Sequence, residues 1–234
     1  MLEQILNKFH RNQTKIVFIH LPKTGGEAIA TALTSIGEEN KNQILLPEEM
    51  KLPKHQTLSE FQNSHNPKGK WVALAVVRNP YDRLVSFYYH LKRWQYDPRY
   101  NNSLPRPQIA AAFASYYDFK DWCSFVLKPD FPSLEASRKV APIDHFKPMN
   151  DYLIAKDSFK TQLEIIRFEN LEADFGEFCN KFDIKAHPLV KVNASRREPQ
   201  ESFMSMYDDA TLELVSSHYR VDFDRFGYDI DLPS

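Results

Sequence analysis

A group of residues suited to binding an anion lies near the start of the chain, in the sequence HLPKTGGEA of residues 20–28. Gly25 and Gly26 let the backbone approach an anion closely. Lys23 adds a positive charge and Thr24 adds a hydroxyl donor. If a helix begins here, its first backbone N–H groups also favour phosphate at this position. The group differs from the GxxxxGK[ST] loop of ATPases, because the lysine precedes the glycines, and a solvated turn is the alternative interpretation.

A second group with related chemistry follows in the sequence VVRNPYDRLVSFYYH of residues 76–90. Arg78 can hold a phosphate through two parallel hydrogen bonds, which a lysine cannot do. Ser86 offers a hydroxyl in the same group. If a helix begins at Pro80, Ser86 lies roughly 10 Å along it. A phosphate held by both residues must then lie beside the helix, or the helix must begin later. The alternative is an ion pair for Arg78 and a packing role for Ser86.

Strand–loop–helix units would position both groups. Each group follows a short run rich in β-branched and aromatic residues and precedes a stretch with helical periodicity. In the second unit Asn79 suits the N-cap and Pro80 the first helical position. The predicted strands cover 15–21, 71–77 and 165–168, and the predicted helices cover 27–36, about 81–94 and about 171–182. This alternation predicts an α/β fold with a mainly parallel sheet.

The composition is that of an ordinary globular protein, with 234 residues of which 42% are apolar and 26% charged. We expect a single domain over residues 1–234. The formal net charge of −1 gives no general attraction to nucleic acid, so no nucleic-acid partner is expected. Residues 94–150 are rich in proline and aromatic residues and are predicted to form long loops, which are often functional.

The cellular setting is predicted from features that the sequence lacks. Cys123 and Cys179 form no CxxC pair, which favours reduced thiols in a cytoplasmic protein. The first ten residues lack the apolar core of a signal peptide. No run of about 18 apolar residues occurs, so no transmembrane segment is expected.

The two groups, in this order and context, resemble the two motifs of the sulfotransferase superfamily that bind 3′-phosphoadenosine 5′-phosphosulfate (PAPS). The closer likeness is to the carbohydrate-type branch, which includes heparan and chondroitin O-sulfotransferases and many bacterial relatives. Two later segments, IIRFENLEADFGEFC and the C-terminal region from Val192 to Asp229, look like further parts of the family pattern. The resemblance implies a three-layer α/β sandwich of the sulfotransferase type, similar to P-loop nucleotide kinases.

The resemblance also implies roles for individual residues. It implies transfer of a sulfuryl group from PAPS to a hydroxyl or amine, with PAP (3′-phosphoadenosine 5′-phosphate) as the product and with no metal ion. The alternatives are an ATP-dependent kinase with a P-loop-like site and a nucleotide-binding protein without activity. By position, Lys23, Thr24, Gly25 and Gly26 would hold the 5′-phosphosulfate, Arg78 and Ser86 the 3′-phosphate, and Asn193, Ser195 and Arg196 would close over the nucleotide.

A general base is needed to take the proton of the acceptor, and histidine suits this role. In many members of the family the catalytic histidine lies a little over twenty residues before the arginine of the second motif. His55 precedes Arg78 by 23 residues and is the predicted base. His65, in the polar loop NSHNPKGK, and Glu60 are the alternatives. His20 is better interpreted as a hydrogen-bonded histidine at the end of the first strand.

Residues 94–150 would form an insertion on the acceptor side. Aromatic faces suit sugar rings and arginines favour an anionic acceptor, so a carbohydrate or glycolipid is predicted rather than a small phenol. The alternative is that Tyr116, Tyr117, Phe119 and Trp122 form the apolar stripe of a core helix. The residues that carry the acceptor hypothesis are Arg93, Trp94, Tyr96, Arg99, Tyr100, Arg106, Tyr116, Tyr117 and Trp122. The oligomeric state has no signal in the sequence.

Overall fold

The chain folds into two compact units, each built from two stretches of sequence. The computed structural model describes residues 15–39, 44–45, 54–65, 70–94, 105–128, 143–156, 161–190 and 202–231. The first unit comprises Met1–Arg78 and Met149–Val192, and the second comprises Asn79–Pro148 and Asn193–Ser234. The expectation of a single domain over 1–234 stays a prediction.

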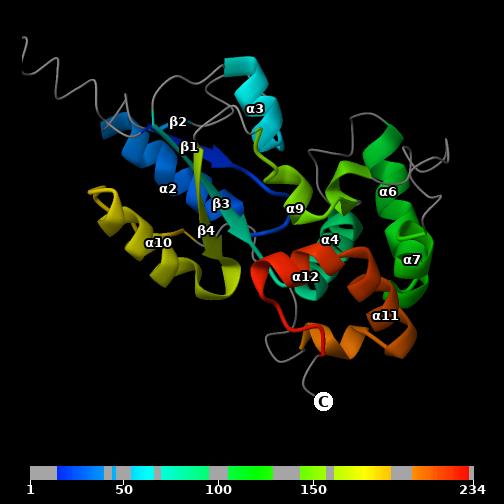
Figure 1. Cartoon of the computed structure of the whole chain (residues 1–234). Helices are drawn as coiled ribbons and strands as arrows, with labels where there is room; N and C mark the ends of the chain where they lie inside the picture. Colours follow the sequence, from blue (N-terminus) through cyan, green and yellow to red (C-terminus); the bar gives the residue numbers. More distant parts are fainter. Residues whose placement is uncertain are drawn as a thin grey trace, which may run out of the picture. The chain divides into compact units, whose positions relative to one another are not determined.

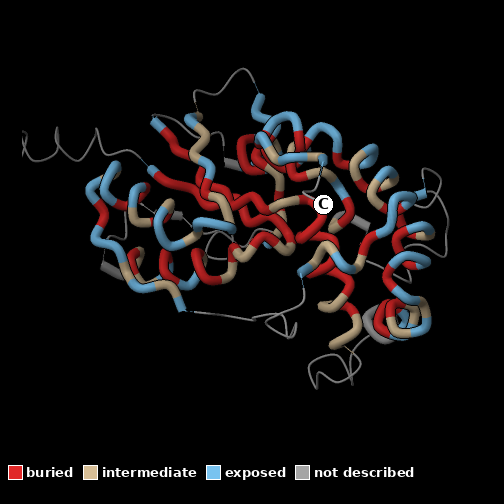
Figure 2. Tube along the Cα trace, turned by 90° about the horizontal axis from the view of Figure 1, so that it is seen from below, coloured by how far each residue is buried: buried red, intermediate tan, exposed pale blue. Residues whose placement is uncertain are grey.

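A parallel sheet forms the centre of the first unit (Figure 1). Its strands are β1 (Lys15–Ile19), β2 (Ile44–Leu45), β3 (Trp71–Val77) and β4 (Thr161–Arg167), in the order β2-β1-β3-β4. All residues of β3 are buried, as expected of a central strand with both faces covered. Figure 2 shows in red the stretches of the chain that are buried in this way. The predicted parallel sheet is confirmed, although β2 is additional and β4 begins earlier than predicted.

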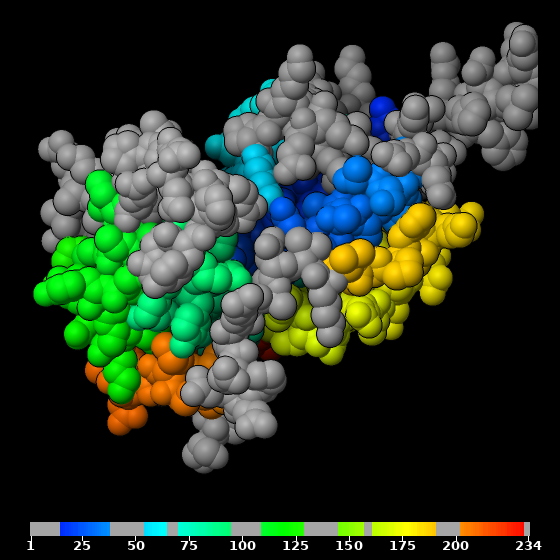
Figure 3. Space-filling view, turned by 180° about the vertical axis from the view of Figure 1, so that it is seen from behind, coloured from blue at the N-terminus to red at the C-terminus, as the bar shows by residue number. Residues whose placement is uncertain are grey.

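One face of the sheet packs against two helices, α2 (Gly26–Glu39) and α10 (Leu171–Lys181). Ile16 of β1 and Val72 of β3 are register partners and belong to the same hydrophobic cluster as Leu33 of α2. The phenylalanines of α10 complete the cluster. Figures 1 and 3 show α2, in blue, and α10, in yellow, beside each other.

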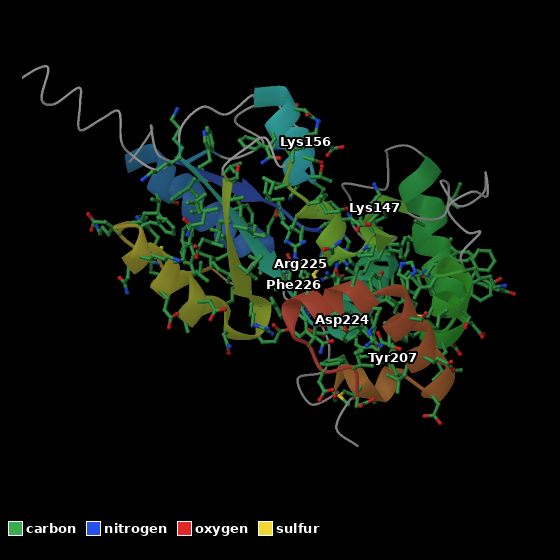
Figure 4. All side chains as sticks on the ribbon, viewed as in Figure 1. Lys147, Lys156, Tyr207, Asp224, Arg225 and Phe226 are labelled. Atoms are coloured by element: carbon green, nitrogen blue, oxygen red, sulfur yellow. The ribbon has the colours of Figure 1, made fainter. Side chains whose placement is uncertain are left out.

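The opposite face of the sheet carries α3 (Leu58–His65). The ring of Phe61 meets the ring of Trp71 edge-on, with 5.3 Å between centroids. Gln62 donates through Nε2 to the hydroxyl of Thr161, the register partner of Trp71, at 3.2 Å. Lys156 lies beside α3 (Figure 4) and donates its backbone N–H to Oε1 of Gln62 at 2.8 Å. These contacts fix α3 over the start of β3 and β4.

The start of α3 explains why residues 63–65 of the predicted NSHNPKGK loop are helical, whereas residues 66–69 lie outside the described residues. The hydroxyl of Thr57 accepts the backbone N–H of Glu60 at 3.2 Å, and the carboxylate of Glu60 accepts the backbone N–H of Thr57 at 2.7 Å. This reciprocal cap satisfies two donors that the first turn of a helix leaves without intrahelical partners. The capped helix then continues to His65.

The second unit is built from helices in the residues that the structure describes. They are α4 (Pro80–Trp94), α6 (Pro105–Tyr116), α7 (Phe119–Val126), α11 (Asp209–His218) and α12 (Arg220–Phe226), with the 3₁₀ turns η2 (Ile143–Phe146) and η4 (Phe203–Met206). α4 begins as predicted, with the N–H of Tyr81 donating to Oδ1 of Asn79 at 2.9 Å. In the described ranges, none of the helices is both long and apolar enough to cross a membrane.

Two helices occupy much of the region predicted to form long loops, so that prediction is wrong for residues 105–128. Pro105 is the first residue of α6, a position where proline is tolerated, so it marks a helix start. Phe119 and Trp122 of α7 are buried in the core of the unit. The helix-stripe interpretation is therefore confirmed for these two residues, whereas Tyr116 is 82% exposed. Tyr96, Arg99, Tyr100 and the side chain of Arg106 lie outside the described residues.

The C-terminal segment of the second unit is tied to the start of α4. The hydroxyl of Tyr207 (Figure 4) donates to the carbonyl of Tyr81 at 2.8 Å, and the hydroxyl of Tyr81 donates to the carbonyl of Ile230 at 3.1 Å. Gly227 ends α12 in the left-handed conformation, with φ of 63°. The C-terminal pattern therefore has a structural role in this unit.

Candidate functional site

The chain leaves β1 through a tight loop, residues 20–25, that leads directly into α2. Thr24 is fully buried, and its hydroxyl donates to the carbonyl of Leu21 at 3.1 Å. Lys23 and Gly25 both have a positive φ, of 65° and 82°. A left-handed conformation is costly for a lysine, so the surrounding structure must hold it there. Backbone strain of this kind concentrates at functional sites.

The two glycines let this loop pack against aromatic rings. A Cβ atom on Gly25 would lie 2.5 Å from Cδ2 of Phe168, and one on Gly26 would lie 2.8 Å from Cδ2 of His20. No larger residue fits at either position without displacing a ring. The backbone therefore forms a close cradle at the start of α2, where the first N–H groups of the helix favour an anion. A phosphate group fits these residues, with Lys23 supplying positive charge.

Arg78 reaches this loop from the carboxyl end of β3. Its Nη1–H donates to the carbonyl of Lys23 at 3.3 Å, and its guanidinium carbon lies 4.0 Å from the centroid of the Phe168 ring. β1 and β3 are neighbours at the centre of the sheet. From β1 the chain continues to β2 on one side, and from β3 it continues to β4 on the other side, so the order of the strands switches between β1 and β3. In open parallel sheets, ligands bind outside the carboxyl ends of the strands at such a point.

His55 joins the loop from the turn that precedes α3. Its Nδ1 lies 2.9 Å from the carbonyl oxygen of His20. Because a carbonyl oxygen can only accept, Nδ1 must carry the proton, and the lone pair of the neutral ring is then on Nε2. The two imidazole rings also meet edge-on, with 5.1 Å between centroids. This contact gives His55 the fixed tautomer and orientation that a general base requires.

His20 is suited to support rather than to proton transfer. Burial, and then the neighbouring basic side chains of His55, Lys54 and Lys23, hold the pKa of His20 well below its ordinary value. The ring is therefore neutral at neutral pH. Glu27 in the first turn of α2 lies 2.7 Å from Nζ of Lys54 and 3.7 Å from Nε2 of His20. The ion pair joins α2 to the turn that carries His55. Glu27 and Lys54 were not among the predicted site residues.

The remaining site predictions concern Glu60, Ser86 and three residues near the C-terminus of the chain. The carboxylate of Glu60 caps α3. Ser86 is buried in α4 of the second unit. Because α4 begins at Pro80, Ser86 lies within the helix and not at its N-terminal end. Asn193, Ser195 and Arg196 lie outside the described residues. Among the residues that the structure describes, no three His, Cys, Asp or Glu side chains form a group that could hold a metal ion.

A family model described as the sulfotransferase family matches residues 8–229. The match covers nearly all of the 234 residues, and the chain therefore belongs to the sulfotransferase family. The carbohydrate-type branch is consistent with this membership. Neither the curated proteins nor the solved structures yielded a match. Membership of the family supports a transferase that moves a sulfuryl group to an acceptor.

Proposed function

We propose that this protein transfers a sulfuryl group from PAPS to a hydroxyl or amine of an acceptor and releases PAP. The observation that carries the proposal is the meeting of three distant segments at the loop after β1. Arg78 donates to the carbonyl of Lys23 at 3.3 Å, and His55 lies 2.9 Å from the carbonyl of His20. Lys23 and Arg78 thus provide one positive group for each phosphate, and His55 provides a base of defined tautomer. All three residues belong to the first unit.

Each residue of this group has a defined task in the proposal. The first N–H groups of α2 and the ammonium group of Lys23 stabilise the negative charge that forms on the leaving phosphate oxygen. Arg78 holds the 3′-phosphate through charged hydrogen bonds. The proposed nucleotide-binding residues are Lys23, Thr24, Gly25 and Gly26 for the 5′ end, Arg78 and Ser86 for the 3′-phosphate, and Asn193, Ser195 and Arg196 closing over the nucleotide. Thr24 belongs to this set through the backbone of the loop, because its hydroxyl already donates to the carbonyl of Leu21 and is not the donor that the sequence predicted.

The proton balance of the reaction depends on His55. In an in-line displacement, the bond from the acceptor oxygen to sulfur forms while the bond from sulfur to the phosphate oxygen breaks. Nε2 of His55 accepts the proton of the acceptor hydroxyl, because Nδ1 already carries a proton and faces the His20 carbonyl. The anionic leaving group is PAP. This scheme requires no metal ion.

We propose that the first unit is part of a three-layer α/β sandwich of the sulfotransferase type within a single domain. α2 and α10 on one sheet face, with α3 on the other, support this arrangement. The proposed location is the cytoplasm, where the two cysteines remain reduced thiols.

A panel of nucleotides tests the activity directly. Thermal stabilisation by PAP without Mg²⁺, together with transfer of label from PAPS to an acceptor, is the expected result. Stabilisation by ATP only in the presence of Mg²⁺ would instead indicate a kinase. Binding of PAP without transfer to any member of a broad acceptor panel would indicate a nucleotide-binding protein without activity.

The proposed acceptor is a hydroxyl of a carbohydrate or glycolipid. Tyr116 is 82% exposed, and its ring meets that of Tyr117 edge-on with 4.9 Å between centroids. Exposed aromatic faces of this kind suit the apolar face of a sugar ring. The measurement is turnover on oligosaccharides compared with turnover on 4-nitrophenol, and we expect the oligosaccharides to be favoured. Efficient sulfation of phenols with none on any sugar would contradict this acceptor class.

A further inference from the structure

We propose that Phe168 is a positioning residue for Arg78. In this inference, the ring of Phe168 is held against Gly25 and fixes the guanidinium group that binds the 3′-phosphate. The inference rests on the proposed function, in which Arg78 contacts that phosphate. Phe168 was not a predicted site residue, and it belongs to the 3₁₀ turn η3 (Phe168–Asn170) directly after β4.

The sheet register brings Phe168 and Arg78 together. Val77 at the end of β3 is the register partner of Arg167 at the end of β4. Arg78 follows Val77 and Phe168 follows Arg167. The two residues therefore lie beside each other just beyond the last register pair of β3 and β4. Side chains alternate between faces along a strand. Both residues therefore continue the face that packs against α2, whose first turn holds the cradle.

Phe168, Arg78 and the loop after β1 each contact the other two. The guanidinium carbon of Arg78 lies 4.0 Å from the ring centroid, well within the range of a cation–π contact. At the ring edge, Cδ2 and Cε2 lie only 2.5 and 2.7 Å from where a Cβ atom of residue 25 would be. Nη1 of Arg78 in turn donates to the carbonyl of Lys23 in the same loop. The ring thus sets the position of the guanidinium relative to the loop.

The energetic effect of this arrangement is preorganisation. A free arginine side chain loses considerable rotamer entropy when it is fixed on a ligand. Stacking on the ring imposes part of that order before the ligand binds. Phe168 also packs at the margin of the hydrophobic cluster of the first unit. The test must therefore separate loss of the ring face from loss of apolar packing.

The experiment compares affinity for PAP with affinity for adenosine 5′-phosphate, which lacks the 3′-phosphate, by calorimetry. Phe168→Leu should weaken PAP binding by about 3- to 30-fold and change adenosine 5′-phosphate binding by less than about twofold. Phe168→Tyr keeps the ring and should keep the affinity for PAP. Phe182→Leu is the matched control, since Phe182 packs at the margin of the same cluster at the end of α10. This control should leave both affinities unchanged.

An Arg78→Ala background provides a second readout. If the ring acts through Arg78, Phe168→Leu should not weaken PAP binding further in that background. If Phe168→Leu weakens PAP binding as much in the Arg78→Ala background as in wild type, the inference is overturned. Equal weakening of PAP and adenosine 5′-phosphate binding in Phe168→Leu alone would also overturn it. Unchanged PAP affinity in Phe168→Leu would also overturn it, and in all three cases the proposed function would stand. If Phe168→Leu fails to fold, Phe168→Met gives the same comparison.

A spectroscopic measurement separates the inference from the proposed function. The Nε–H signal of Arg78 should be shifted by the ring current in wild type and in Phe168→Tyr, and the shift should disappear in Phe168→Leu. If PAP does not bind wild type, the proposed function fails, and this signal still tests the positioning. An identical Arg78 signal in wild type and Phe168→Leu would overturn the inference.

Discussion

Gly25 combines a positive φ of 82° with a ring edge in the space where a Cβ atom would lie. Gly25→Ala should therefore destabilise the protein by at least about 1–2 kcal/mol, the usual cost of a left-handed L-residue. It should also weaken PAP binding, because the loop would move off Phe168. Thermal unfolding and PAP titration measure the two effects.

Gly37 provides the matched control for this substitution. It lies within α2, and nothing is within 4 Å of its Cβ position. Gly37→Ala should stabilise the protein by roughly 0.5–1 kcal/mol, because alanine loses less backbone entropy in a helix. Similar effects of the two substitutions would contradict the assigned role of Gly25.

His55 is the second residue whose role can be tested alone. His55→Ala should lower turnover by about 10²-fold, typical of losing a general base, and leave PAP affinity intact. His218 is a control, since its Nε2 also contacts a main-chain carbonyl, that of Phe146, at 3.1 Å in the second unit. His218→Ala should leave turnover near that of wild type. Near-normal turnover of His55→Ala would transfer the role to Glu60 or His65.

At the scale of elements, the start of α11 depends on one carboxylate. Asp208 accepts the backbone N–H of Thr211 at 3.0 Å and the hydroxyl of Thr211 at 2.6 Å, and it lies 3.2 Å from Nζ of Lys120 on α7. The hydrogen bonds from Thr211 and, less strongly, Lys120 lower the pKa of Asp208 from 3.8 to about 2. The cap therefore ties α11 to α7 through a charged group.

The acid stability of the protein should reflect this cap. Because the pKa of Asp208 is lower in the folded state, its contribution is complete above about pH 4 and is lost as pH falls toward 2. Asp208→Asn keeps a capping oxygen but should remove this part of the pH dependence of stability. Asp208→Ala removes the cap and should lower Tm by a few degrees at neutral pH. Thermal unfolding from pH 7 to pH 2 measures both, with Asp209→Asn as the control. An unchanged acid slope in Asp208→Asn would contradict the assignment.

At the scale of the whole molecule, each unit has one buried thiol in its core. Cys123 lies in the aromatic core of the second unit, and Cys179 lies in the cluster between sheet and helices of the first. Burial raises the pKa of Cys179 to about 11 and that of Cys123 well above its ordinary value. Both thiols should therefore be unreactive in the native protein at neutral pH.

The two thiols report separately on the unfolding of the two units. If the chain is a single domain, both cysteines should become reactive at the same urea concentration, because the units then unfold together. Mass spectrometry of each labelled cysteine along a urea series measures this, with fully unfolded protein as the reference. Two separate midpoints would contradict the single-domain prediction.

The elements that the sequence determines by itself are those with strong local signals. The run WVALAVV predicts β3 with its bounds because a wholly apolar run of this length is typical of a strand buried on both faces. Asn79 and Pro80 predict the start of α4 because capping depends on adjacent residues. The glycine pair after β1 likewise predicts the loop that leads into α2, and its binding of an anion stays a prediction. The position of His55 came from resemblance, since no local signal distinguishes a base from another histidine.

The tertiary structure alone decided which distant residues meet. Strand pairing puts Phe168 beside Arg78, and an ion pair joins Glu27 to Lys54 across 27 positions of sequence. Neither contact has a signal in periodicity or capping, which report only on neighbouring residues. The same limit explains α6, where Pro105 begins a helix although the proline-rich composition favours a loop. Packing against α4 and the aromatic core stabilises that helix, because burial of apolar surface outweighs weak local preference.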